Sequence, residues 1–202
     1  MQVLTPQPMS MPAAGPATCA QVEGRLKTQD IRFRPLAQTE DVQPGRVTLS
    51  GGDTVEAEVL ILVPPNRPPP VVRESGLTGD GDWVQVDPST LATEHQRIYA
   101  IGDVVEMQTG AGLPFPKAGV FAERHGEVVA RNIAAAVADR APSEEFEGFG
   151  YCFLEVGGGA ASMVRGNFLA QPPAIEIGDA APEHLESKEA FERDRLARWF
   201  PG

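Results

Sequence analysis

The sequence predicts an α/β fold that ends in a β-hairpin and an amphipathic helix. A short apolar run at residues 98–101 precedes a Gly-Asp pair, a loop and a helical pattern that starts at Pro116, which is typical of a strand–loop–helix unit in a parallel sheet. Residues 150–168 alternate as a hairpin around three glycines, and residues 183–200 have helical periodicity. The 19 prolines and 21 glycines among 202 residues favour a loop-rich α/β chain over a helical bundle.

Composition excludes several classes of protein. The formal net charge of −11 and the absence of a basic stripe argue against a nucleic-acid partner. Two cysteines, Cys19 and Cys152, are too few for a disulfide scaffold. No apolar run is long enough to span a membrane, and the first residues lack the pattern of a secretory signal. We therefore expect a cytoplasmic protein, and we expect no metal site.

The first 70 residues predict short elements joined by turns. The expected elements are the end of a strand at 3–6, a helix at about 16–27, and strands at 31–33, 46–49, 54–57 and 59–63. Residues 64–70 are rich in proline and predict a stiff, extended connector between two core strands. The alternative for this segment is a surface linker or a ligand for a partner protein.

The middle of the chain predicts the central strand and helix. Residues 83–87 alternate as a half-buried strand, and a turn at residues 87–93 leads to the buried strand at residues 98–101. The helix at about 116–139 places its apolar residues on one broad face. His125 lies within this helix, where we favour a packing or surface role over acid–base chemistry.

The candidate binding site lies where the central strand ends. In open α/β sheets the ligand crevice lies beyond the carboxyl ends of the strands, so the Asp103 carboxylate is placed to accept hydrogen bonds from ligand hydroxyls. Gly102 lets the backbone approach a ligand closely. Pro116 suits the first turn of a helix, and Gly119 leaves that helix start open, with free N–H groups and a partial positive charge.

The runs IYAIGD and PKAGVFAE together resemble the second flavin-contacting motif of the flavoproteins with two dinucleotide-binding domains. Within the FAD-dependent pyridine nucleotide-disulfide oxidoreductase superfamily, the sequence is most similar to the sulfide:quinone oxidoreductase and flavocytochrome c sulfide dehydrogenase branch. The resemblance implies that Asp103 binds the ribityl chain of FAD and that Lys117, Ala118 and Gly119 lie near the flavin ring. Without the resemblance, the same residues describe an ordinary strand–loop–helix unit with a capping aspartate.

The resemblance also implies a domain organisation for a Rossmann-like, FAD/NAD(P)-binding protein. Residues 1–70 correspond to the end of a nicotinamide-binding-like inserted domain, residues 71–140 to the C-terminal part of the FAD-binding domain, and residues 141–202 to a hairpin and helix. No G-x-G-x-x-G motif follows a strand near the N-terminus, although such flavoproteins need one to bind the FAD pyrophosphate. We therefore expect a fragment, or one half of a split protein, that is inactive alone.

Cys152 is the candidate catalytic residue. Sulfide-oxidising members of the resembled family carry a redox cysteine near the flavin in their C-terminal region. Redox chemistry would need a thiolate, and therefore surroundings that lower the pKa of the thiol. We favour the alternative, in which Cys152 packs in a strand as a small apolar residue.

The expected function is electron transfer in the complete protein. A sulfide, thiol or NAD(P)H donor would reduce FAD, and a quinone-type acceptor would reoxidise it. The alternatives are a type II NADH dehydrogenase-like flavoenzyme and a non-catalytic remnant that pairs with an N-terminal half. The resemblance implies peripheral attachment of residues 183–200 to the inner membrane surface. Their balanced charge favours docking onto the same subunit or a homodimer partner.

Overall fold

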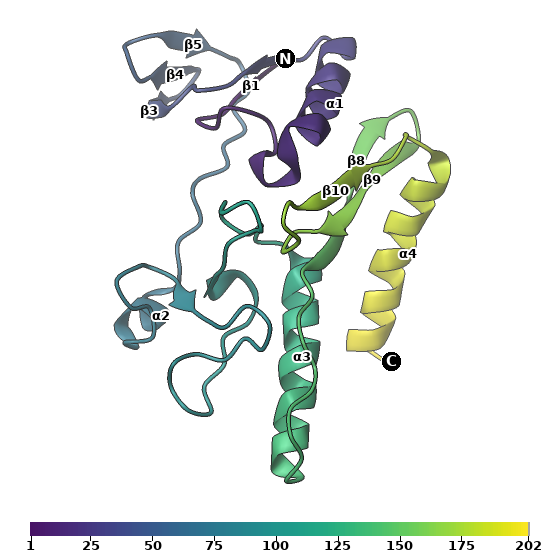
Figure 1. The fold of residues 1–202 in the computed structure, drawn as a ribbon. Coiled ribbons are helices and arrows are strands. Elements are labelled where there is room, and N and C mark those ends of the chain that lie inside the picture. The colour runs from purple at the N-terminus through teal and green to yellow at the C-terminus, as the bar shows by residue number, and fades with distance from the viewer. Residues whose placement is uncertain (202) are drawn as a thin grey trace. The chain divides into compact units, whose positions relative to one another are not determined.

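The computed structural model describes residues 1–201 and divides the chain into two compact units, Met1–Arg67 and Pro68–Gly202. Both units combine helices with short strands (Figure 1). The predicted α/β class is therefore confirmed. The assignment of residues 1–70, 71–140 and 141–202 to three functional regions stays a prediction.

The first unit contains a small parallel sheet and an antiparallel sheet. A crossover through η1 (Pro12–Ala14) and α1 (Gly15–Thr28) makes the first two strands parallel neighbours, as in a βαβ unit. The antiparallel sheet has the order β3-β4-β5. The strands of this unit are β1 (Gln2–Leu4), β2 (Arg32–Arg34), β3 (Thr39–Gln43), β4 (Arg46–Leu49) and β5 (Thr54–Glu56). The predicted helix and hairpin are confirmed, and β3 was not predicted.

The strand predicted at residues 59–63 is wrong. This run has no regular secondary structure, and Val59, Ile61 and Val63 are 77%, 87% and 93% exposed. Within this run, only Leu60 packs against the core cluster that includes Leu49. An apolar, β-branched run becomes a strand only when a neighbouring edge accepts its backbone hydrogen bonds, and no described strand pairs with this one.

The predicted central strand at residues 98–101 is also wrong. Tyr99 makes only an isolated antiparallel bridge with Ala92. Ile98 and Ile101 are 40% and 44% exposed, so this run is not a core strand. The parallel pairing expected of it is made four residues later, by β7 (Val105–Glu106) with β6 (Val84–Gln85). Of the predicted strand, Ala100 alone joins the buried cluster that contains Val84 and Val105.

The second unit is built on a long helix and a three-stranded antiparallel sheet of order β10-β9-β8. The predicted hairpin and both predicted helices are confirmed, whereas β10 and the short helix α2 were not predicted. The remaining elements are α2 (Pro70–Glu74), η2 (Gly102–Val104), α3 (Gly119–Val137), β8 (Phe149–Gly157), β9 (Ala160–Asn167), β10 (Ala174–Ile177) and α4 (Pro182–Trp199). Pro116 lies before α3 rather than in its first turn, because the backbone is still extended at Ala118 and the helix begins at Gly119.

Packed aromatic rings hold the start of α3 against the hairpin. The ring of Phe121 lies edge-on to Phe115, Phe146 and Phe168, with centroid separations of 4.7, 6.2 and 5.3 Å. Phe121 also lies directly against the backbone of Gly150 on β8, where any Cβ atom would collide with the ring. These contacts fix the first turn of α3 relative to the sheet.

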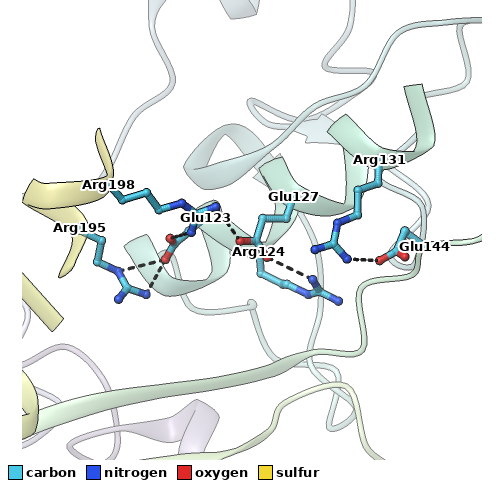
Figure 2. A network of polar contacts seen from close by, with 7 residues as sticks. All are labelled: Glu123, Arg124, Glu127, Arg131, Glu144, Arg195 and Arg198. Atoms are coloured by element: carbon cyan, nitrogen blue, oxygen red, sulfur yellow. Dashed lines mark hydrogen bonds and ion pairs between the residues drawn. The ribbon is translucent and has the colours of Figure 1, made fainter. Parts of the chain in front are cut away.

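Charged side chains join α4 to α3. Arg195 donates to Glu123 over 2.7 and 3.2 Å, and Arg198 bridges Glu123 and Glu127 (Figure 2). No described residue of α4 is buried, although Phe191 stacks edge-on against Tyr151 of the hairpin. The terminal helix therefore docks on its own chain, which is one of the two arrangements that the sequence favoured. Within residues 1–201, no helix has the length and apolarity needed to cross a bilayer.

Candidate functional site

The turn η2 displays the Asp103 carboxylate to solvent. Gly102 has a φ of +71°, a left-handed conformation that favours glycine, and a Cβ atom there would lie 3.3 Å from the Cβ of Ala122. The turn can therefore lie close against α3. Asp103 is exposed, and none of residues 1–201 makes a hydrogen bond to its carboxylate oxygens. Both oxygens are free to accept hydrogen bonds from a ligand.

The N-terminus of α3 opens beside this turn with its positive end uncompensated. No side chain caps the helix, and its first turn contains no acidic residue. Gly119 is exposed, and the space that its side chain would fill is open. Uncapped N–H groups and the helix dipole together favour an electron-rich ligand at this position.

Lys117 ties the turn to the segment before α3. Its Nζ donates to the carbonyl oxygens of Asp103 and Val105 over 2.6 and 3.1 Å, and it lies 3.6 Å from the ring centroid of Trp83. Burial lowers the pKa of Lys117, and the negative charges of Asp103 and Glu106 oppose that shift. The ammonium group therefore holds the backbone in place and adds positive charge next to the Asp103 carboxylate.

The structure brings five of the six predicted binding residues around one small cavity and places the sixth next to it. Gly102, Asp103, Pro116, Lys117 and Ala118 line a cavity of about 10 Å³, and Gly119 begins the adjacent helix. This space is about the size of one water molecule, so no ring fits between the turn and the helix. A ligand that contacts these groups must lie on their open side.

His125 packs within α3, as the sequence favoured, but its contact with the site was not predicted. It is 3% exposed, its Nδ1 accepts a hydrogen bond from the Gly102 N–H over 3.1 Å, and its ring packs edge-on against Phe146. Burial lowers the pKa of His125 to about 4, although the Asp103 charge opposes this shift. His125 and Gly102 are 23 residues apart in sequence, so no local spacing pattern indicates the contact.

Cys152 lies on β8, apart from the six residues around η2 and α3. Its neighbour across the hairpin is Val164 of β9, and it makes no disulfide. Its side chain is exposed, so the expected role as a buried, packed strand residue is wrong. Desolvation nevertheless raises the pKa of the Cys152 thiol, which is the opposite of the shift that a reactive thiolate requires. Within residues 1–201, no cluster of His, Cys, Asp and Glu has the geometry of a metal site.

Comparison with known sequences identifies one family profile. The family described as "Pyridine nucleotide-disulphide oxidoreductase" matches residues 2–135. The mitochondrial sulfide:quinone oxidoreductase of Mus musculus is 24% identical over 129 residues, which cover 63% of this chain and 27% of that protein.

Solved structures show the same fold. The sulfide:quinone oxidoreductase of Aquifex aeolicus superposes with a TM-score of 0.82 at 20% identity, covering 97% of this chain and 49% of that one. The NAD-dependent persulfide reductase of A. fulgidus superposes with a TM-score of 0.59 at 21% identity, covering 82% of this chain and 31% of that one. The sequence thus spans about half the length of the first structure.

Proposed function

Because the chain belongs to the pyridine nucleotide-disulphide oxidoreductase family, we propose that residues 102–119 form part of the flavin site of an FAD-dependent oxidoreductase. The observation that carries the proposal is the unpartnered, exposed carboxylate of Asp103 beside an uncapped helix start. FAD offers ribityl hydroxyls that donate hydrogen bonds and an electron-rich ring edge that accepts them. The Asp103 carboxylate supplies the acceptor for the hydroxyls, and the N–H groups at the start of α3 supply donors for the ring edge.

The proposed role of each residue follows from the group that it presents. Asp103 accepts hydrogen bonds from ribityl hydroxyls, and Gly102 allows the backbone to approach. Ala118 and Gly119 present free amides to the pyrimidine edge of the ring, where reduction increases negative charge. Lys117 adds a cation nearby while fixing the turn. Bound FAD supplies the electron transfer itself, and the protein binds and orients it.

This site holds only part of a dinucleotide. The sequence contains no G-x-G-x-x-G at the start of a helix, so the proposal needs the FAD pyrophosphate to be bound by residues outside these 202. The parallel sheets β1-β2 and β6-β7 each have two strands, whereas parallel sheets are usually larger and covered on both faces. We therefore expect the isolated chain to bind FAD weakly.

For the complete enzyme we propose sulfide:quinone reductase-like activity, with a sulfide or thiol donor and a quinone-type acceptor. The A. aeolicus and mouse proteins that this chain resembles are named for that reaction. The exposed side chains of Leu196, Trp199 and Phe200 near the end of α4 suit a peripheral membrane contact through which a quinone would arrive. A type II NADH dehydrogenase-like activity is the alternative, in which NAD(P)H is the donor.

The test is the absorbance of the flavin bound to the complete enzyme under anaerobic conditions. Bleaching by sulfide and recovery on adding a short-chain quinone support the proposal, whereas bleaching by NADH alone favours the alternative. Asp103→Ala should lower FAD affinity at least about tenfold, because a hydrogen bond to a charged group contributes roughly 1.5–3 kcal/mol. Full flavin retention by this variant would remove Asp103 from the site.

Cys152 is tested in the same assay. We propose that Cys152 is not redox-active, because it does not line the cavity beside Asp103 and the pKa of its thiol is raised rather than lowered. Cys152→Ser should then leave sulfide-dependent flavin reduction unchanged. Loss of that reduction, with NADH-dependent or dithionite reduction intact, would instead assign the redox role to Cys152.

A further inference from the structure

The contact between His125 and Gly102 joins a buried side chain to the exposed turn of the site. The imidazole is 3% exposed and lies one turn beyond Phe121 in α3. Its Nδ1 accepts the Gly102 N–H over 3.1 Å, and its Nε2 has no hydrogen-bond partner in residues 1–201. The Gly102 amide is therefore the single hydrogen-bond partner of this buried ring.

The direction of this hydrogen bond fixes the state of the imidazole. A backbone N–H can only donate, so Nδ1 must carry a lone pair and Nε2 must carry the proton. A protonated imidazole would have N–H groups on both nitrogens and could not accept. Burial against Phe146 keeps the ring neutral, and the facing charge of Asp103 does not reverse this.

The contact supports one side of the turn η2, and Lys117 supports the other. Gly102 is the first residue of η2, and its left-handed backbone conformation aims the next residue, Asp103, toward solvent. Lys117 holds the far side of the turn through the Asp103 and Val105 carbonyl oxygens. His125 holds the near side, so the two side chains together fix the backbone on either side of the Asp103 carboxylate.

We infer that His125 is a positioning residue, which as a neutral, Nε2-protonated imidazole fixes the Gly102 amide and thereby the direction of the Asp103 carboxylate. The effect on FAD rests on the proposed flavin site, whereas the effect on the turn does not. His125 itself touches no ligand in this arrangement. Its action passes through the backbone of Gly102.

Two substitutions separate this role from simple packing. In His125→Asn the side-chain oxygen can occupy the place of Nδ1 and accept the Gly102 N–H. In His125→Gln the longer side chain places its amide near the position of Nε2, and the acceptor at Nδ1 is lost. Both variants replace the ring with a neutral amide, so they control for charge and for lost aromatic packing.

The first readout uses the full chain without flavin. Amide hydrogen exchange at Gly102 is expected to accelerate at least about tenfold in His125→Gln and to stay within about threefold of wild type in His125→Asn. Nitrogen-15 chemical shifts of the wild-type imidazole should show an unprotonated Nδ1. Equal exchange rates in the two variants, or a protonated Nδ1, would overturn the inference.

The second readout uses the flavin-loaded protein. The dissociation constant for FAD should rise about tenfold in His125→Gln and remain near wild type in His125→Asn. If His125→Gln and His125→Asn bind FAD equally well although their Gly102 amides exchange at different rates, His125 does not contribute to FAD binding through the turn. If the complete wild-type protein binds no FAD, the proposed function fails while the exchange result still decides the role of His125 in the turn.

Discussion

The helix α3 is held in different ways on two of its faces. Its first turns, at Phe121 and His125, are fixed by packed rings and one buried hydrogen bond. The adjoining face, at Glu123 and Glu127, is joined to α4 by partly exposed ion pairs (Figure 2). Packing is short-ranged and insensitive to salt, whereas exposed ion pairs are weak and screened. The proposed site thus lies against the rigid, packed face of α3, and α4 is attached to the adjustable, charged face.

The largest expected effect is at the packed face. Phe121→Ala removes a ring that is 4% exposed, and we expect the free energy of unfolding to fall by about 3–5 kcal/mol. Urea unfolding of the isolated chain measures this loss. Phe149→Ala is the matched control, because that ring is 55% exposed and should cost less than about 1 kcal/mol. Similar losses in both variants would show that the rings do not anchor the helix.

The second effect sharpens the role of burial at His125. The folded pKa is about 4 and the ordinary value is 6.5, so between these values the unfolded chain binds the proton more readily. Stability is therefore full above pH 6.5 and falls toward pH 4, by up to about 3 kcal/mol from this group. His125→Asn should flatten this part of the stability–pH profile. If stability still falls as steeply between pH 6.5 and pH 4 in His125→Asn, groups other than His125 cause the fall.

The third effect tests the charged face. Glu123→Gln should lower stability by about 1 kcal/mol and speed amide exchange across α4, because it weakens the pairs with Arg195 and Arg198. Raising the salt concentration to about 1 M should bring the wild type toward the variant. Glu176→Gln, which breaks an exposed pair with Arg165 on the sheet, should leave α4 exchange unchanged. Salt-independent exchange in α4 would contradict the comparison.

The smallest effect on stability is expected where neither kind of anchor exists. Ile61 is 87% exposed, so Ile61→Lys should change the free energy of unfolding by less than about 0.5 kcal/mol. The same change should reduce self-association of the isolated chain, because exposed apolar strand-like runs pair with one another. Val137→Lys is the control: Val137 is comparably exposed but lies at the end of a helix, so this change should leave self-association unaltered. Light scattering compares the three proteins.

Local sequence patterns predicted the parts of the fold that depend on near neighbours. The hairpin, α1, α3 and α4 follow from periodicity. The binding role of the six residues from Gly102 to Gly119 rests on motif resemblance and stays a prediction. The runs at residues 59–63 and 98–101 were mispredicted because a strand depends on an edge that sequence does not reveal. His125 was placed on the helix, but its role depends on a turn 23 residues away.

Gly150 connects the hairpin to the proposed site through its contact with Phe121. Its missing side chain sets how closely β8 approaches Phe121, and Phe121 belongs to the turn of α3 that follows the open amides. Any larger residue at position 150 would act as a wedge, lifting the helix tip while every group around Asp103 stayed chemically intact. If all amino acids are tested at position 150 of the complete enzyme, the variants that retain the yellow colour of bound FAD should therefore carry glycine almost alone.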